Sequence, residues 1–275
     1  MRKPMLVLGA LFLALGMLAA CGSASEKGGA GQKNNTNANE NSGSGSTEKK
    51  ELTIGTEGVY KPFSFKDLET GELTGYDVEV AREVAKRIGM KPNFVPTPWK
   101  SMFASLNSKR FDMIANQVGI TKERKKNYAF SIPYTYSGAR VIVNKDNTTI
   151  KGVEDLKGKV VGTTRGSNYA KYAKEAGAKV KYYKGIGQVL KDLSLKRIDA
   201  ALNDRLFILT ELDGSKYDVK AVGGVFHEVK MAFAFREKGS DQLVKKVNKA
   251  LKSMKEDGTL AEISKKWFGE NVSER

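Results

Sequence analysis

Apolar and polar positions divide the chain at residue 50. Residues 5–20 form an uncharged apolar run after the basic Arg2 and Lys3, and this run is shorter than the roughly 20 residues that a membrane-spanning helix needs. A basic start, a short apolar core and small residues at its end predict a signal peptide over residues 1–20. Residues 22–50 contain no Val, Ile, Leu or aromatic side chain. Because such a segment cannot offset the entropy of ordering its backbone, a flexible tether is expected over residues 21–50.

Two hydrophobic patterns alternate over residues 51–275. Short β-branched runs predict strands at 52–55, 93–96, 111–116, 160–163, 179–183, 198–202 and 231–235. Amphipathic stretches predict helices at 77–88, 102–109, 168–176, 188–195 and 206–212, and a further helix with Ser240 as its N-cap and Gly258 as its stop. This alternation is typical of an α/β fold with mostly parallel sheets.

One segment of the chain is echoed by another. Ser105–Asn116 aligns without gaps with Asp192–Asn203, and both keep the same Leu, Lys, Arg, Asp and final Asn. The simpler interpretation is that any helix–turn–strand unit looks somewhat like this, and the functional one is a pair of similarly built lobes. In open α/β sheets, ligands bind outside the carboxyl ends of the strands. Asn116-Gln117 and Asn203-Asp204 would then both face whatever lies between the lobes.

The composition excludes several classes of site. Cys21 is the single cysteine and His227 the single histidine, so the chain has no internal disulfide and no zinc site of the usual Cys and His spacing. A Ser-His or Cys-His catalytic pair would have to use His227, which has no partner pattern and which we expect at the surface or in a crossover segment. No Gly-rich phosphate-binding loop is evident. We therefore expect no catalytic residue, no metal and no cofactor.

The net charge is +16, from 47 Lys and Arg against 31 Asp and Glu. With 40% hydrophobic and 28% charged residues, the bulk of the chain has the composition of an ordinary globular protein. A basic protein can bind nucleic acid, but here the Lys residues are dispersed and interleaved with Glu, and a secreted chain argues against that partner. We expect no nucleic acid, and we attribute the charge to residence beside an anionic cell surface.

Four ordered segments of the chain resemble the polar-amino-acid solute-binding proteins of ABC importers (family 3). They are Gly55–Phe63, Gly75–Val78, Asn116–Arg124 and Met254–Gly269. The tetrapeptide Leu-Ala-Ala-Cys at 18–21 resembles a bacterial lipobox, in which the thiol of the Cys is acylated; the alternative is an ordinary signal peptide with a chance Cys. The Gly-Thr-Glu-Gly sequence at 55–58 and the segment 106–112 most resemble the cystine-binding branch from Gram-positive bacteria.

This resemblance implies a two-lobed periplasmic-binding-protein-like fold with two crossing hinge strands. Lobe 1 would comprise residues 51–141 and 231–275, and lobe 2 residues 142–230. It further implies a monomer that closes around one amino acid, delivers it to an ABC transporter permease, and is held at the outer face of the cytoplasmic membrane by a lipid on Cys21. An enzyme on this scaffold would need a general acid or base in the cleft; Glu57 is available, but no second group is evident. A ligand-sensing adaptor would have the same site.

An amino-acid ligand is a zwitterion, so its site needs a cation and an anion that are both well hydrogen-bonded. For the α-carboxylate the resemblance selects Arg124, whose guanidinium offers a planar pair of donors; composition alone would place it on a solvated, charged surface. For the α-ammonium it selects Asp204, which alternatively is the N-cap of the helix at 206–212. Gly119 would bring a backbone N–H close to the carboxylate, and Thr121 would add a hydroxyl.

Further candidates come from turns and aromatic positions. Ser167 and Asn168 lie at a strand-to-helix turn, where free backbone N–H groups favour an anion; the alternative is simple N-capping. The resemblance makes Tyr60 and Trp99 the aromatic walls for the ligand side chain, although aromatic residues are more often part of a core.

Two charged positions bear on the choice of ligand. Glu57 would meet the side chain of a basic amino acid, or the distal ammonium of cystine. Arg165 stands where the family often carries Gln, and a cation there would disfavour arginine or lysine and suit a second carboxylate. Together Glu57 and Arg165 favour cystine, while a basic amino acid (arginine, lysine or histidine) stays the alternative.

Overall fold

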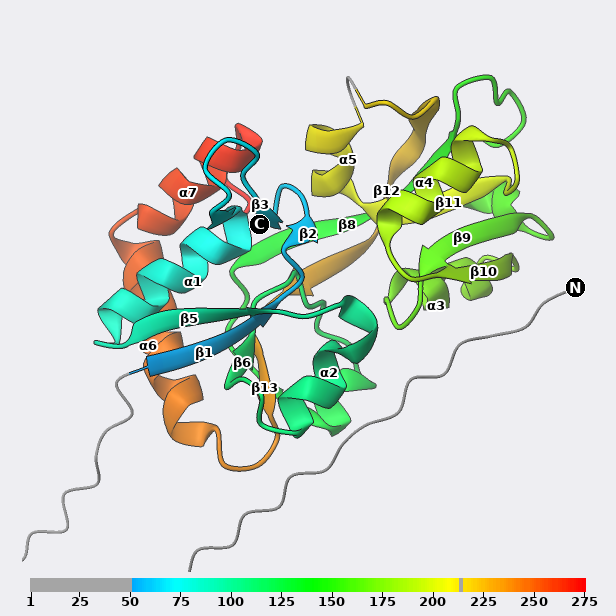
Figure 1. The fold of residues 1–275 in the computed structure, drawn as a ribbon. Helices are drawn as coiled ribbons and strands as arrows, with labels where there is room; N and C mark the ends of the chain where they lie inside the picture. The colour runs from blue at the N-terminus through cyan, green and yellow to red at the C-terminus, as the bar shows by residue number, and fades with distance from the viewer. Residues whose placement is uncertain (1–50, 213–214) are drawn as a thin grey trace, which may run out of the picture. The chain divides into compact units, whose positions relative to one another are not determined.

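A computed structural model describes residues 51–212 and 215–275. The predicted signal peptide, the tether and Cys21 lie outside these described residues. The described chain contains two five-stranded sheets, one three-stranded sheet and helices that pack on them (Figure 1). The expected α/β fold is therefore confirmed.

The first five-stranded sheet has the order β5-β1-β6-β13-β7. Its strands are β1 (Glu51–Thr56), β5 (Lys91–Pro96), β6 (Met113–Ile114), β7 (Tyr128–Phe130) and β13 (Ala234–Arg236), and its helices are α1 (Tyr76–Arg87), α2 (Trp99–Asn107), α6 (Asp241–Glu256) and α7 (Thr259–Phe268). β1 is parallel to β5 and β6, while β13 is antiparallel to β6 and β7. We call this sheet and its helices the first lobe.

Alternating side chains place the helices of the first lobe on both faces of its sheet. Met113 and Phe235 belong to the buried cluster that includes α1, α6 and α7, whereas the neighbouring Ile114 and Ala234 belong to the cluster around α2. Because successive strand residues point to opposite faces, α2 lies on one face and the other three helices on the opposite face. The apolar runs seen in the sequence are thus strands buried on both sides. The sheet is mixed, with two parallel and two antiparallel pairings, so the expectation of mostly parallel sheets is wrong for it.

The second five-stranded sheet has the order β10-β9-β11-β8-β12. Its strands are β8 (Thr135–Asn144), β9 (Val160–Thr164), β10 (Lys179–Tyr183), β11 (Ala200–Asp204) and β12 (Val219–Met231), and its helices are α3 (Tyr169–Glu175), α4 (Ile186–Ser194) and α5 (Arg205–Glu211). β9 is parallel to β10 and β11, and β8 is antiparallel to β11 and β12. We call this sheet and its helices the second lobe.

Strands β8 and β12 run from the first lobe to the second (Figure 1). They pair with each other from Thr135↔Met231 to Asn144↔Val219, with irregular register between Val222 and Glu228. The two strands approach closely there, since a Cβ at Gly138 would lie 2.3 Å from Cγ1 of Val225. The fold is therefore two-lobed with two crossing strands, as predicted. The predicted lobe boundaries at residues 141 and 231 fall within β8 and at the end of β12, and they stay a prediction.

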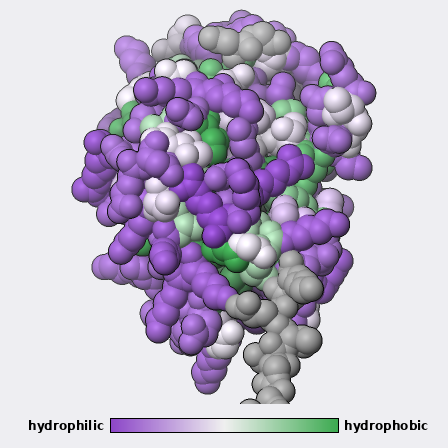
Figure 2. Space-filling view, turned by 90° about the vertical axis from the view of Figure 1, so that its left-hand side faces the viewer, coloured by the Kyte–Doolittle hydropathy of each residue, from purple (hydrophilic) through white to green (hydrophobic). Residues whose placement is uncertain are grey.

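The remaining elements are short. β2 (Val59–Tyr60), β3 (Ser64–Lys66) and β4 (Leu73–Thr74) form the three-stranded sheet, and η1 (Arg124–Lys126) and η2 (Val153–Leu156) are 3₁₀ turns. The face of the molecule in Figure 2 is mainly hydrophilic, with apolar residues in small separate patches. No helix among the described residues is long and apolar enough to span a bilayer.

Several sequence predictions of secondary structure were wrong in detail. The strand expected at 111–116 shrinks to Met113–Ile114, because Asn116 turns to hydrogen-bond the backbone of Glu57. The strand expected at 231–235 is two strands, β12 ending at Met231 and β13 starting at Ala234. Ser240 does precede α6, but its hydroxyl makes no capping bond and is buried without a partner in the described structure.

Candidate functional site

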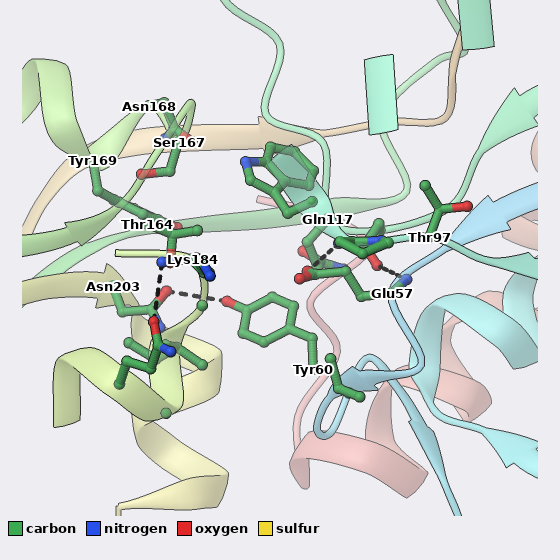
Figure 3. A pocket seen from close by; sticks show the side chains of 18 of the residues that line it. Glu57, Tyr60, Thr97, Gln117, Thr164, Ser167, Asn168, Tyr169, Lys184 and Asn203 are labelled. Atoms are coloured by element: carbon green, nitrogen blue, oxygen red, sulfur yellow. Dashed lines mark hydrogen bonds between the residues drawn. The ribbon is translucent and has the colours of Figure 1, made fainter. Parts of the chain in front are cut away.

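A cavity of about 710 Å³ opens between the two lobes (Figure 3). In the first lobe its lining follows the carboxyl ends of β1, β5 and β6, and in the second lobe it follows those of β9 and β10 and includes the end of β11. The lining residues are Glu57, Val59, Tyr60, Pro96, Thr97, Pro98, Trp99, Asn116, Gln117, Thr164, Ser167, Asn168, Tyr169, Lys184, Gly185, Ile186, Gly187, Gln188, Leu202 and Asn203. Both lobes thus contribute the strand ends at which α/β sheets bind ligands.

Seven of the twelve predicted ligand residues line this cavity. They are Glu57, Tyr60, Trp99, Asn116, Gln117, Ser167 and Asn168. Gly119, Thr121, Arg124, Arg165 and Asp204 are not among its lining residues. The echoed residues Asn116 and Asn203 both reach the cavity, one from each lobe.

Glu57 and Asn116 form one unit on the wall of the first lobe. Oδ1 of Asn116 accepts a hydrogen bond from the Glu57 backbone N–H at 2.8 Å, and Nδ2 of Asn116 donates to Oε2 of Glu57 at 2.9 Å. Burial raises the pKa of Glu57 above its ordinary value, and the hydrogen bond from Asn116 opposes that effect. The amide therefore fixes the carboxyl group at the cavity and favours its ionised form.

Tyr60 links the lobes across the cavity. Its hydroxyl donates to Oδ1 of Asn203 at 3.0 Å, and its ring stacks on Phe207 with centroids 5.7 Å apart. Oδ1 of Asn203 also accepts the backbone N–H of Asp204 at 2.8 Å. The amide of Asn203 is thereby oriented with its oxygen toward Tyr60.

The side chain and backbone of Gln117 are positioned by a buried carboxyl group. Asp77 is fully buried and accepts hydrogen bonds from N and Nε2 of Gln117, both at 2.8 Å, and from the hydroxyl of Tyr134 at 2.7 Å. Burial raises the pKa of Asp77 to about 7, against the opposing effect of these hydrogen bonds. Gln117 itself has a positive φ of 46° and a buried Oε1 with no partner in the described structure. Asp77 therefore sets which polar atom Gln117 offers to the cavity.

Arg124 lies beside the cavity, between the lobes. Nη1 donates to the carbonyl oxygen of Gly119 at 2.8 Å and Nη2 to that of Gly166, in the second lobe, at 3.1 Å. The guanidinium carbon is 5.4 Å from the ring centroid of Trp99. Burial lowers the pKa of Arg124 to about 10, so the group still carries its charge at neutral pH. Arg124 is thus half-buried, with its guanidinium held by two carbonyl groups.

Gly119 and Asn168 converge on the same point. A Cβ at Gly119 would lie 3.5 Å from Oδ1 of Asn168 and 3.6 Å from Nη1 of Arg124. The hydroxyl of Thr121 instead accepts the backbone N–H of Arg124 at 3.1 Å, which supports the turn that carries the guanidinium. N-capping is not the role of the Asn168 side chain, since α3 has no side-chain cap. Oγ of Ser167 and Nδ2 of Asn168 are both buried without a hydrogen-bond partner in the described structure.

Asp204 does cap a helix, as the alternative interpretation held. Oδ1 accepts the backbone N–H of Leu206, the first turn of α5, at 2.8 Å and the hydroxyl of Ser137 at 2.6 Å. Oδ2 accepts the hydroxyl of Tyr169 at 3.0 Å. Burial raises the pKa of Asp204, and the hydrogen bonds oppose that effect. The carboxyl group is anchored at Oδ1, and Oδ2 keeps free lone pairs.

Arg165 is placed differently from its predicted position at the cavity. Its guanidinium carbon lies 4.7 Å from the ring centroid of Tyr182, and the residue is exposed. The cation that lines the cavity from the second lobe is Lys184, which sequence reasoning missed. Lys184 directly follows the strand at 179–183, so the strand-end rule that selected Asn116 would have found it.

The described residues contain no group of three or more His, Cys, Asp or Glu side chains that could hold a metal ion.

Residues 52–270 match the model of the bacterial extracellular solute-binding proteins, family 3. The chain belongs to this family. Among its relatives is the L-cystine-binding protein TcyA of Bacillus subtilis (strain 168), which is 48% identical over 275 residues, 99% of this chain and 100% of TcyA.

Solved structures of the family cover most of the chain. An ancestral arginine-binding protein bound to arginine is 39% identical, with a TM-score of 0.74 over 80% of this chain and 99% of that one. The L-cystine solute receptor of Neisseria gonorrhoeae, in an unliganded open conformation, is also 39% identical, with a TM-score of 0.57 over 83% of this chain and 96% of the receptor. The fold of the family thus extends over the described residues of both lobes.

Proposed function

We propose that this protein is the extracellular binding component of an ABC importer, and that it closes around one amino acid, with L-cystine favoured, for delivery to a membrane permease. The observation that carries the proposal is the full-length similarity to an L-cystine-binding protein, combined with a cavity lined by strand ends of both lobes. A cavity of about 710 Å³ suits a small molecule. In this proposal it acts as a binding protein and not as an enzyme.

The α-carboxylate of the ligand binds beside Arg124. Support comes from the convergence of Arg124, Gly119 and Asn168, and from the unpartnered Oγ of Ser167 and Nδ2 of Asn168. Buried polar atoms without hydrogen bonds destabilise a protein, and a carboxylate would pair with both donors. Arg124 keeps its bonds to Gly119 and Gly166 and binds the carboxylate with its remaining N–H groups, since a guanidinium has five donors.

The α-ammonium binds at Oδ2 of Asp204 and Oε1 of Gln117. Oδ2 of Asp204 accepts one hydrogen bond, from Tyr169, and Oε1 of Gln117 accepts none from the described residues. Tyr60 and Trp99 pack against the ligand's side chain from the first lobe. Thr121 supports the site indirectly, through its hydrogen bond to the backbone of Arg124. Arg165 adds a positive charge to the second lobe but does not line the cavity.

The crossing strands β8 and β12 form the hinge between lobe 1 (51–141 and 231–275) and lobe 2 (142–230). The hydrogen bonds of Tyr60 to Asn203 and of Arg124 to Gly166 connect the two lobes. A higher TM-score against an arginine-bound relative than against an open receptor fits lobes that lie in the closed arrangement. The protein acts as a monomer, held by a lipid on Cys21 and a tether at the outer face of the cytoplasmic membrane.

A basic amino acid such as arginine is the alternative ligand, favoured by Glu57 and by the arginine-bound relative. A thermal-shift screen of the twenty amino acids and L-cystine, without reductant, separates the two ligands. A ligand at 100 times its Kd stabilises the native state by about 2.7 kcal/mol, so L-cystine should give the largest shift. A shift with arginine and none with cystine would support the alternative, and no shift with any amino acid would contradict the proposed function.

The same binding site would serve a ligand-sensing adaptor. Uptake of labelled cystine by cells that lack the gene decides between the adaptor and the importer. We expect uptake to fall and to recover when the gene is restored. Unchanged uptake, with cystine binding intact in the purified protein, would favour the adaptor.

A further inference from the structure

Two charged side chains line the cavity from opposite lobes. Among the described residues that line it, Glu57 and Lys184 alone carry a formal charge. Glu57 follows β1 in the first lobe and Lys184 follows β10 in the second, and Figure 3 shows both at the cavity. The cavity lining thus contains one carboxyl group, that of Glu57, and one ammonium group, that of Lys184. Arg124 and Asp204 are further charged residues, but they are not part of the lining.

The Lys184 ammonium has no structural partner in the described part of the chain. Nearby lysines do have one: Lys181 pairs with Asp192 at 3.0 Å, and the ammonium of Lys174 lies 5.9 Å from the ring centroid of Tyr182. Lys184, directly after β10, forms no ion pair within 4.0 Å and no aromatic contact with the described residues. A lysine in a cavity wall without such a contact is available to an anionic ligand.

The backbone at Lys184 is fixed, and there is space beside it. Its N–H donates to Oε1 of Gln188, in the first turn of α4, at 3.2 Å. The next residue, Gly185, is the N-cap of α4, and a Cβ there would meet no atom within 4 Å. The side chain of Lys184 therefore starts from a defined point at the edge of open space, and the partial positive charge at the start of α4 has the same sign.

We infer that Lys184 is a specificity-determining residue that binds a carboxylate at the distal end of the ligand side chain, while Glu57 binds an ammonium at that same end. The inference rests on the proposed function and narrows its substrate class to amino acids whose side chain ends in a second zwitterion, such as cystine or cystathionine. Arginine would pair with Glu57 but place a second cation near Lys184. Glutamate would pair with Lys184 but place a carboxylate near Glu57. Rejection by like charge is an ordinary source of specificity.

The contribution of Lys184 is moderate because the residue is exposed. An ion pair in full contact with water contributes little, whereas hydrogen bonds to charged groups in partly enclosed sites are stronger. We expect removal of the ammonium to weaken binding of a distal carboxylate about tenfold, which corresponds to about 1.4 kcal/mol. This is smaller than the effect expected at Arg124.

The test uses the purified protein and four ligands with the same cysteine half. L-cystine carries both distal charges, S-(2-carboxyethyl)-L-cysteine the carboxylate, S-(2-aminoethyl)-L-cysteine the ammonium, and S-propyl-L-cysteine neither. Calorimetry gives the Kd of each ligand for the wild type, Lys184→Met, Lys184→Arg and Glu57→Gln. Lys191→Met is the matched control, since Lys191 is exposed in α4 and does not line the cavity.

Lys184→Met should weaken the binding of cystine and of the carboxyethyl ligand about tenfold. It should leave the Kd of the propyl ligand unchanged, and it should leave unchanged or lower the Kd of the aminoethyl ligand. Lys184→Arg keeps a cation and should bind the two carboxylate ligands as the wild type does. Glu57→Gln should weaken the binding of the two ammonium ligands. Lys191→Met should bind all four ligands as the wild type does. Equal effects of Lys184→Met on all four ligands, or no effect on any, would overturn the inference. If cystine fails to bind the wild type, the proposed function fails first, and that result is distinct.

Discussion

Replacing Asp77 with Asn removes a titrating carboxyl group from beneath the cavity. Asp77 is fully buried, and all three of its partners donate to it: N and Nε2 of Gln117 and the hydroxyl of Tyr134. An Asn side chain can accept from two of these donors through its oxygen, but its NH₂ group would then face the N–H of Gln117. One buried donor loses its acceptor, which costs about 1–3 kcal/mol.

The pH dependence of the free energy of unfolding gives a second magnitude for Asp77. Burial raises the pKa of Asp77 from 3.8 to about 7 in the folded protein. Between these values the folded state holds a proton that the unfolded state has released, so the free energy of unfolding decreases as pH rises from about 4 to about 7 and is level above that. At about 1.4 kcal/mol per pKa unit, this interval corresponds to about 4 kcal/mol. The Asn variant lacks this contribution.

Urea denaturation at pH values from 4.5 to 8 measures both effects. The variant should be less stable than the wild type at pH 4.5. The wild type loses about 4 kcal/mol as pH rises, more than the cost of the substitution, about 1–3 kcal/mol, so the two free energies of unfolding should converge and then cross. Some slope will persist in the variant, because burial also raises the pKa of Glu57 and of Asp204. Asp241→Asn changes an exposed carboxyl group at the start of α6 and should follow the wild type. Parallel pH profiles for the wild type and Asp77→Asn would refute this reasoning.

Three further substitutions probe the site. Arg124→Ala should weaken amino-acid binding at least a hundredfold, about 3 kcal/mol, because a buried carboxylate loses a charged pair of donors; near-normal affinity by calorimetry would contradict its role. Asp204→Ala should weaken binding as strongly, and it should also lower the thermal midpoint because α5 loses its cap; Asp204→Asn, which keeps the capping oxygen, should recover the midpoint but not the affinity. Tyr60→Phe removes the bond to Asn203, about 1 kcal/mol, and should enlarge the radius of gyration in small-angle scattering; an unchanged radius would show that this bond does not hold the lobes together.

Helix positions and strand positions within each lobe were largely predictable from periodicity. The helix expected at 77–88 forms over Tyr76–Arg87, and the strand expected at 179–183 forms over those residues. The crossing strands were not predicted from pattern. β12 includes Gly223, Gly224 and mostly exposed residues, and its pairing with the distant β8 is what makes it a strand. Nonlocal pairing leaves no short-range signal in such a segment.

For the site, the strand-end rule worked and individual roles were harder to predict. Asn116 and Gln117 reach the cavity as expected, because they follow the buried β6. The sequence does not show that Asp77 reaches Gln117, since that contact joins residues far apart in the chain. Arg165 and Lys184 both follow strands of the second lobe, but only the backbone path after each strand decides that Lys184 lines the cavity. Which side chain faces the cavity is thus set by tertiary structure.

The bonds from Tyr60 to Asn203 and from Arg124 to Gly166 also have a kinetic consequence. Each must break before a molecule can enter between the lobes, so the association rate is reduced by the fraction of time the lobes spend together. The same bonds supply part of the free energy of lobe closure, so the bound amino acid has to supply less of it. They also slow the dissociation of the amino acid. Weakening either bond should therefore speed both capture and release, and speed release the more. At the mouth of a transporter, a cargo molecule must be handed over as well as held. The pace of the cycle would depend on these two hydrogen bonds together with the ion pairs of Glu123 with Lys171 and of Arg205 with Glu270, which also join the lobes.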